Sequence, residues 1–202
     1  MYKIDINELL YNIEKYAHEN YIPIMQKESI KLLNEIIKEQ NPAKILEIGT
    51  AIGYSAINIL TNCNGKVYTI EINEDRIEIA KENFKKASLS NRVTIFQGDA
   101  KEILPMAAGE YDFILLDGPK GYYNRFLKDL LRLLKKDGIL FCDNVYYKGM
   151  VLGKENKKHK SISINMREFI SKLKSLSCLE VEFYDIGDGL AICKKIGEYT
   201  DD

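Results

Sequence analysis

The sequence has 202 residues, of which 46% are hydrophobic and 29% are charged, and 29 basic side chains nearly balance 30 acidic ones. These values are typical of one compact globular domain, so we predict a single domain over residues 1–202. No window approaches the roughly 20 consecutive apolar residues that cross a bilayer, and the first residues do not form a signal-peptide core. We therefore expect a cytoplasmic protein without a membrane partner.

The cysteine and histidine content limits the chemistry that the chain can perform. The four cysteines are Cys63, Cys142, Cys178 and Cys193. They are widely separated and form no C-x-x-C pair, so we predict buried thiols and neither a disulfide framework nor a zinc site. His18 and His159 are the only histidines, which disfavours a Ser-His-Asp hydrolase or a histidine-rich metal centre. Carboxylates, amides and lysines are left to carry any reaction.

The first 42 residues are predicted to form a helical cover made of two amphipathic helices. Apolar residues recur there at helical spacing, at Ile6, Leu9, Leu10 and Ile13 and again at Leu32, Leu33, Ile36 and Ile37. The Asn41-Pro42 dipeptide closes this segment, since the residue before a proline disfavours helix.

Short β-branched runs and helical patterns alternate through the rest of the chain. The expected strands are residues 44–48, 66–71, 92–96, 111–117, 138–143, 179–186 and 190–195. This alternation predicts an α/β fold with a parallel sheet that is covered by helices on both faces. Only Gly187, Asp188 and Gly189 separate the last two strands, so these two must form an antiparallel hairpin.

A glycine-containing loop follows the first predicted strand. Gly49 and Gly53 in EIGTAIGYSA (residues 47–56) let the backbone turn tightly, and a ligand can approach such a bare backbone closely. Ala51 stands where a G-x-G-x-x-G fingerprint has its second glycine, which disfavours a pyrophosphate site. Packing alone would also explain a single turn of this kind.

Two further elements follow the next two strands. Glu71 ends the second strand, 22 residues after Gly49, where a carboxylate can accept hydrogen bonds from both hydroxyls of an adenosine ribose. The sequence Gly98-Asp99-Ala100 follows the third strand and can place Asp99 beside an adenine ring. Three such elements at consecutive strand ends favour a nucleotide-like ligand over packing.

Two carboxylates and an amide follow the fourth and fifth strands. Asp117 ends the fourth strand, Asp143 ends the fifth, and Asn144 comes next. The ends of these strands are expected near the crevice where doubly wound sheets bind ligands. Oxygen donors of this kind suit Mg²⁺, although Asp and Asn also begin turns and cap helices.

Lys120 lies three residues beyond Asp117 and can reach the same place. A bound cation and burial would lower the pKa of Lys120 toward the range of a general base. A solvated surface lysine is the structural alternative.

Together these motifs resemble the metal-dependent and S-adenosylmethionine-dependent O-methyltransferases of the catechol and caffeoyl-CoA type. The stretches that carry the resemblance are EIGTAIGYS, Glu71, GDA, LLDGPKGYY and CDNVYYKG, which span nearly the whole chain. The resemblance implies a Rossmann-like class I methyltransferase fold with a seven-stranded, mostly parallel sheet. It also implies S-adenosylmethionine and Mg²⁺, or another divalent cation, as cofactors.

The motifs and the resemblance together give the candidate site residues. The predicted cofactor contacts are Met25, Glu47, Gly49, Ala51, Gly53, Ser55, Glu71, Gly98, Asp99, Ala100 and Asp117. The predicted metal ligands are Asp117, Asp143 and Asn144, and the predicted catalytic residues are Lys120 and Asp117. Gly118-Pro119 departs from the relatives' pattern and stiffens the loop that carries Lys120.

Within this family, residues 21–29, 143–151 and 186–195 are most similar to the bacterial tRNA 5-hydroxyuridine methyltransferases. That similarity implies methyl transfer to the C5 hydroxyl of 5-hydroxyuridine at the wobble position, giving 5-methoxyuridine. The neighbouring oxygens of a catechol would chelate the same metal, so a small-molecule catechol or caffeoyl-CoA acceptor is the alternative. A nucleotide-binding or RNA-binding module without catalysis is a third possibility, and relatives are often homodimers.

The region after the predicted metal ligands is strongly basic. Residues 148–174 contain eight basic side chains against two acidic ones, a local charge of +6. The predicted contacts with a tRNA anticodon region are Lys148, Lys154, Lys157, Lys158 and Lys160. Tyr122, Tyr123, Tyr146 and Tyr147 flank this edge and are candidates for stacking on a splayed base, although core packing would also explain them. A solvated lysine-rich loop is the alternative for the basic residues.

Overall fold

The computed structural model describes residues 5–146, 149 and 160–199 of the chain. The chain divides into two compact units, residues 1–100 and residues 101–202. The single domain expected from the composition stays a prediction. Among the residues described, no helix combines the length and the apolar character needed to cross a membrane.

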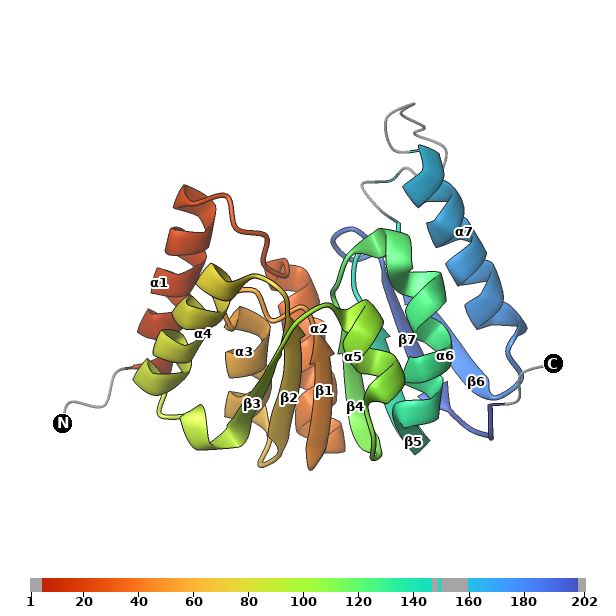
Figure 1. Ribbon diagram of the computed structural model, residues 1–202, viewed down its shortest axis with the longest axis horizontal. Coiled ribbons are helices and arrows are strands. Elements are labelled where there is room, and N and C mark those ends of the chain that lie inside the picture. The colour runs from red at the N-terminus through yellow and green to blue at the C-terminus, as the bar shows by residue number, and fades with distance from the viewer. Residues whose placement is uncertain (1–4, 147–148, 150–159, 200–202) are drawn as a thin grey trace. The chain divides into compact units, whose positions relative to one another are not determined.

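The first unit contains the N-terminal helices and three strands. Its elements are α1 (Ile6–Glu19), α2 (Lys27–Gln40), β1 (Lys44–Ile48), α3 (Tyr54–Asn62), β2 (Lys66–Glu71), α4 (Glu74–Lys86), η1 (Ser90–Arg92) and β3 (Val93–Gln97) (Figure 1). β2 lies between β1 and β3 and pairs in parallel with both. The alternation of strands and helices predicted for this half is therefore confirmed.

The helices α1 and α2 confirm the predicted amphipathic pair. Asp5 caps α1, because its side chain accepts a hydrogen bond from the amide of Asn7 at 2.8 Å. Leu9, Ile13 and Ala17 are spaced by four residues and are the buried face of α1.

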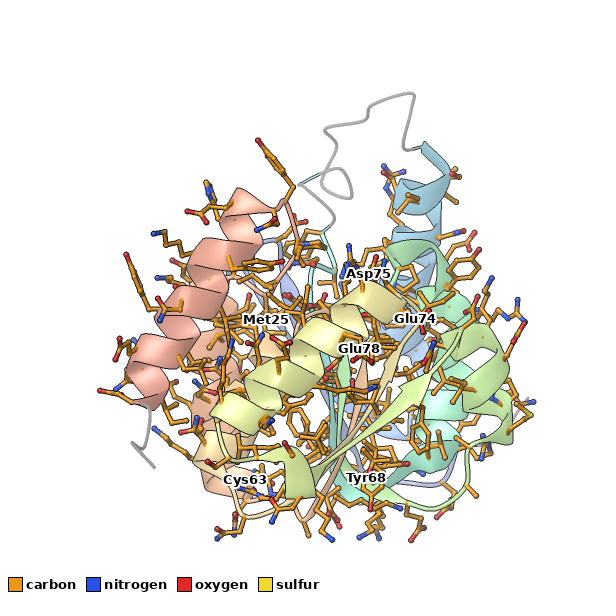
Figure 2. The ribbon with its side chains drawn as sticks, turned by 60° about the vertical axis from the view of Figure 1, so that its left-hand side comes forward. Met25, Cys63, Tyr68, Glu74, Asp75 and Glu78 are labelled. Carbon is orange, nitrogen blue, oxygen red and sulfur yellow. The ribbon has the colours of Figure 1, made fainter. Side chains whose placement is uncertain are left out.

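The helix α4 begins at a well-defined cap at the end of β2. The side chain of Asn73 accepts a hydrogen bond from the amide of Arg76 at 2.9 Å. Glu74 and Asp75 in the first turn interact favourably with the positive end of the helix dipole. Figure 2 shows them with Glu78 on α4, at the opposite end of this unit from Cys63.

Arg92 closes the other end of the first unit. Its guanidinium group donates hydrogen bonds to the carbonyls of Leu60, Cys63 and Gly65 at 2.7–2.9 Å. The last carbonyls of a helix lack partners within the helix, so this side chain stabilises the end of α3.

The described part of the second unit contains four strands, three α-helices and one short 3₁₀ helix. Its elements are α5 (Ala100–Met106), β4 (Tyr111–Leu116), η2 (Lys120–Tyr122), α6 (Tyr123–Leu133), β5 (Leu134–Cys142), α7 (Lys160–Ser175), β6 (Leu179–Tyr184) and β7 (Leu190–Lys195) (Figure 1). The strand order is β4-β5-β7-β6, with β4 and β5 parallel and β7 antiparallel to both of its neighbours. The predicted C-terminal hairpin is therefore confirmed.

The strand β5 begins at Leu134, four residues before the start expected at Gly138. The helix α6 ends at Leu133, and the chain enters the strand without a loop. The buried ammonium group of Lys195 donates hydrogen bonds to the carbonyls of Leu131 and Leu134 at 2.9 and 2.8 Å. This partner comes from β7, more than sixty residues away in the chain, so the local sequence pattern could not reveal it.

Candidate functional site

The glycine loop between β1 and α3 has the tight backbone that its sequence predicts. Gly49, Ala51 and Gly53 all have positive φ angles, of 96°, 45° and 86°. The amide of Gly49 donates to the carbonyl of Ile70 in β2 at 2.9 Å. A Cβ atom at Gly53 would lie 2.8 Å from the ring of Phe84, so glycine is also needed for the close approach of α4.

Glu47, near the end of β1, fixes this loop through hydrogen bonds. Its fully buried carboxylate accepts hydrogen bonds from the hydroxyls of Thr50 at 2.6 Å and Thr69 at 2.7 Å, and also from the hydroxyl of Ser55. These bonds fix both ends of the loop to the sheet, because Thr69 belongs to β2 and Ser55 to α3. Direct contact of Glu47 and Ser55 with a cofactor stays a prediction.

Glu71 is held at the end of β2 by three backbone amides. Its carboxylate accepts hydrogen bonds from Ala51 at 2.9 Å, Ile72 at 3.0 Å and Asn73 at 2.9 Å. A carboxylate has about four acceptor positions, so this arrangement orients the group and leaves capacity for a further donor.

The Gly98-Asp99-Ala100 motif lies beside Glu71. The amide of Gly98 donates to the main-chain carbonyl of Glu71 at 2.9 Å. The structure therefore brings together the three motifs that the sequence singled out at consecutive strand ends. Met25 is buried in the segment between α1 and α2 (Figure 2), and its contact with a cofactor stays a prediction.

Three residues around this loop were not predicted from the sequence. Asn83 in α4 is buried and donates from Nδ2 to the carbonyl of Ile52 at 2.9 Å. Ile72 follows Glu71 directly and exposes 64% of its surface, so it offers an apolar surface beside the carboxylate. Tyr54 contacts Glu14, forty residues earlier. Only Ile72 had a local signal, an apolar residue after a strand-ending acid.

In the second unit, the two predicted carboxylates follow paired positions of neighbouring strands. Leu116 of β4 is in register with Cys142 of β5, and the amide of Asp143 donates to the carbonyl of Leu116 at 3.1 Å. Asp117 and Asp143 therefore leave the sheet side by side. Asp143 is fully buried, and its Oδ1 accepts a hydrogen bond from the amide of Asn144 at 2.9 Å.

Lys120 forms an ion pair with Asp117, with 2.8 Å between Nζ and Oδ1. The ammonium group also lies 5.3 Å from the centre of the Tyr123 ring. Burial lowers the pKa of Lys120, but the Asp117 carboxylate and Tyr123 outweigh it and raise the pKa above its usual value. The Asp117 carboxylate stabilises the charged form in this arrangement, and the lowering of the pKa expected from a bound cation stays a prediction. Lys120 is a protonated hydrogen-bond donor here.

Tyr123 is a core residue, so its predicted role in stacking on a base is wrong. The ring is fully buried, and its hydroxyl group lies 2.9 Å from the carbonyl of Leu116 and 3.1 Å from that of Asp143. This hydroxyl group thus bridges the ends of β4 and β5. Tyr122 is 38% exposed and stacks on Phe126.

The turn of the C-terminal hairpin holds the segment that follows Asn144. The amides of Val145 and Tyr146 donate to the carbonyls of Gly189 and Asp188, each at 2.9 Å. A Cβ atom at Gly189 would lie 2.2 Å from the ring of Tyr146, so this position requires glycine. Tyr146 therefore packs on the turn, and Tyr147 lies outside the described residues.

The predicted metal site has only three ligands. The described part of the chain contains no group of three or more His, Cys, Asp or Glu side chains that could hold a metal ion. The set predicted here has two carboxylates and the amide of Asn144, and it stays a prediction. Of the predicted RNA contacts, Lys160 begins α7, and the other four lysines lie outside the described ranges.

Comparison with known proteins identifies the family. A family model described as O-methyltransferase matches residues 3–196. Tapetum-specific methyltransferase 1 of Arabidopsis thaliana is 28% identical over 193 residues, which cover 91% of this chain and 82% of that protein. Caffeoyl-CoA O-methyltransferase 2 of Populus trichocarpa is 28% identical over 178 residues, which cover 82% of this chain and 72% of that protein.

Solved structures agree with this assignment. A Staphylococcus aureus protein provisionally described as a caffeoyl-CoA O-methyltransferase has a TM-score of 0.86 and 31% identity, covering 92% of this chain and 91% of that chain. The likeness confirms the predicted fold class, a class I methyltransferase fold with mostly parallel strands and an antiparallel C-terminal hairpin. The chain therefore belongs to the O-methyltransferase family.

Proposed function

We propose that the first unit binds S-adenosylmethionine as the methyl donor. The glycine loop offers bare backbone, Glu71 can accept hydrogen bonds from the ribose hydroxyls, and Ile72 offers an apolar surface to the adenine ring. Two structural neighbours support the choice of ligand: the Podospora anserina methyltransferase PaMTH1 is described as SAH-bound, and a Bacillus cereus O-methyltransferase as a complex with SAH. SAH, S-adenosylhomocysteine, is what remains of the donor after transfer.

In this proposal, Asp117, Asp143 and Asn144 of the second unit hold a divalent cation such as Mg²⁺. Their carboxylate and amide oxygens are the hard donors that this ion prefers, and Asp117 and Asp143 follow paired positions of β4 and β5. A bound cation would supply the positive charge that lowers the pKa of an acceptor hydroxyl.

Lys120 has a role in this proposal that follows from its protonation. Its ammonium group stays charged beside Asp117, so it can donate a hydrogen bond to an acceptor oxygen and stabilise the negative charge that develops there. Tyr123, whose ring lies next to Lys120, connects the ends of β4 and β5 through its hydroxyl group. The acceptor hydroxyl loses its proton to solvent water, and its oxygen forms a bond to the methyl carbon as the bond between that carbon and sulfur breaks.

The acceptor that we propose is a small molecule of the catechol or caffeoyl type, with two neighbouring oxygens. One observation carries this choice: caffeoyl-CoA O-methyltransferases recur among the relatives of this chain.

A second candidate acceptor is 5-hydroxyuridine at the wobble position of tRNA, which also has two neighbouring oxygens. The observation that favours it is the local charge of +6 over residues 148–174, which suits phosphate contacts. In this second proposal a homodimer would present two such basic segments to RNA.

A parallel assay distinguishes the two acceptors. The full chain and a triple variant, Lys157→Gln, Lys158→Gln and Lys160→Gln, are each supplied with S-adenosylmethionine, Mg²⁺ and either a catechol or tRNA that carries 5-hydroxyuridine without its methyl group. Equal catechol methylation by both proteins, with no 5-methoxyuridine by mass analysis, supports the small-molecule acceptor. Formation of 5-methoxyuridine by the unmodified chain, and its loss in the triple variant, would instead establish the tRNA acceptor.

A further inference from the structure

One contact ties the N-terminal helices to the start of α3. The hydroxyl group of Tyr54, the first residue of α3, donates a hydrogen bond to Oε1 of Glu14 in α1. The other oxygen of Glu14 lies 2.7 Å from Nζ of Lys27, the first residue of α2. Glu14 therefore joins three helices of the first unit.

The bond between Tyr54 and Glu14 is the sheltered half of this cluster. Tyr54 is 4% exposed, whereas the side chain of Lys27 is 72% exposed, so solvent screens the ion pair. Burial, and then the Glu14 carboxylate, raise the pKa of Tyr54 well above its usual value. The hydroxyl group therefore remains a donor at any physiological pH.

The position of Tyr54 gives this bond its significance. It follows Gly53 directly, so it is the first helical residue after the glycine loop. Hydrogen bonds connect the loop to Glu47 of β1 and to Asn83 of α4. The bond between Tyr54 and Glu14 connects the start of α3 to α1 as well. The segment between α1 and α2 also contains Met25, which is buried.

We propose that Glu14 is a positioning residue for the methyl donor, which it orders by fixing the start of α3 through Tyr54. This inference rests on the proposed binding of S-adenosylmethionine at the glycine loop. We assign Glu14 no contact with the donor: it acts on the loop only through its hydrogen bond with Tyr54. Its loss should weaken donor binding and leave the rate of transfer at saturating donor unchanged.

The test is calorimetric titration of the full chain with SAH. Tyr54→Phe and Glu14→Ala each remove the hydrogen bond and should raise the Kd about tenfold, as expected for a bond to a charged group. Glu14→Gln keeps an acceptor oxygen for Tyr54, so it should bind SAH nearly as the unmodified chain does. Glu19→Gln, which removes an exposed partner of Lys15 on the same helix, is the matched control and should leave the Kd unchanged.

Kinetics supply a readout that a purely structural role would not move. In Tyr54→Phe the KM for S-adenosylmethionine should rise about tenfold while kcat at saturating donor is retained. An unchanged Kd in Tyr54→Phe and Glu14→Ala, with only a lower melting temperature, would overturn the positioning role and leave the proposed function intact. Failure of the unmodified chain to bind SAH would instead overturn the proposed function, and this inference with it.

Discussion

Lys195 illustrates how this chain accommodates a charged group in its interior. The side chain is 5% exposed, and its ammonium group donates to two carbonyls at the junction of α6 and β5. Burial of a polar group costs free energy unless the group is hydrogen-bonded. Here the buried ammonium group and the two buried carbonyls satisfy each other's hydrogen bonds.

Replacement of Lys195 by Met should therefore lower the free energy of unfolding by about 2–3 kcal/mol, because two buried carbonyls lose their donor. Lys194→Met is the matched control, since that side chain is 47% exposed and lies 3.7 Å from Asp137. Its effect should stay within about 0.5 kcal/mol. Urea unfolding followed by circular dichroism measures both values, and equal losses in the two variants would refute the role given to Lys195.

Cys142 is the thiol that the structure protects most clearly. Burial raises the pKa of this thiol, and a hydrogen bond with Cys193 raises it further. Because the folded pKa lies above the unfolded one, the stabilising contribution is complete below the unfolded value, about 8.5, and is lost as the pH rises above it.

We expect iodoacetamide to leave Cys142 unmodified in the folded chain at pH 8.5 and to label it once urea unfolds the chain. Mass analysis of the peptides measures the labelling. The free energy of unfolding should also fall between about pH 8 and pH 10, because the thiol of the unfolded chain ionises in this range. Rapid labelling of Cys142 without urea would show that its thiol is not buried as described.

At the scale of elements, local patterns predicted the pieces whose cause is local. The bounds of β1, β2 and β7 agree with the predicted strands, because each is a short run rich in apolar residues between turn signals. The start of β5 was missed because Lys195 stabilises it from a distant strand. Of the two interpretations of Tyr123, core packing is the correct one, because its buried hydroxyl group joins two strand ends.

The candidate site shows the same division between local and distant causes. The glycine loop, Glu71 and the two aspartates could be found from their places at strand ends. The contacts that hold them could not, because Glu14 and Asn83 come from helices far along the chain. A tertiary hydrogen bond leaves no periodic signal in the sequence.

The approach of α4 to the start of α3 depends on Gly53. Gly53→Ala should destabilise the fold by about 2–3 kcal/mol, because a Cβ atom would meet the Phe84 ring at 2.8 Å and the φ angle of 86° is strained for alanine. Gly121→Ala is the control, since a Cβ atom there meets nothing within 4 Å. Thermal unfolding compares the two, and a Gly53→Ala variant as stable as the control would contradict the packing described.

At the scale of the whole molecule, the candidate residues divide between the two units. Residues 1–100 contain all the predicted donor contacts except Asp117, and residues 101–202 contain Asp117, the other residues assigned to a cation, and Lys120. This division predicts that the two functions can be lost separately.

Asp143→Ala tests that separation. SAH affinity should remain within about twofold of that of the unmodified chain, whereas methyl transfer in the presence of Mg²⁺ should fall by more than the roughly 10–100-fold cost of losing a residue that only supports a metal ligand. Calorimetry measures the first quantity and product formation the second. Equal losses of SAH binding and transfer would contradict the role given to Asp143.

The proposed reaction is best tested by transfer of labelled methyl from S-adenosylmethionine to a catechol by the full chain, with Mg²⁺ and with excess EDTA. We predict a methylated hydroxyl in the presence of Mg²⁺ and its loss in EDTA, recovered when Mg²⁺ is added back. Transfer at the same rate in EDTA would contradict the metal role of Asp117, Asp143 and Asn144. No transfer to catechol or to tRNA that carries 5-hydroxyuridine, under either condition, would contradict the proposed reaction itself.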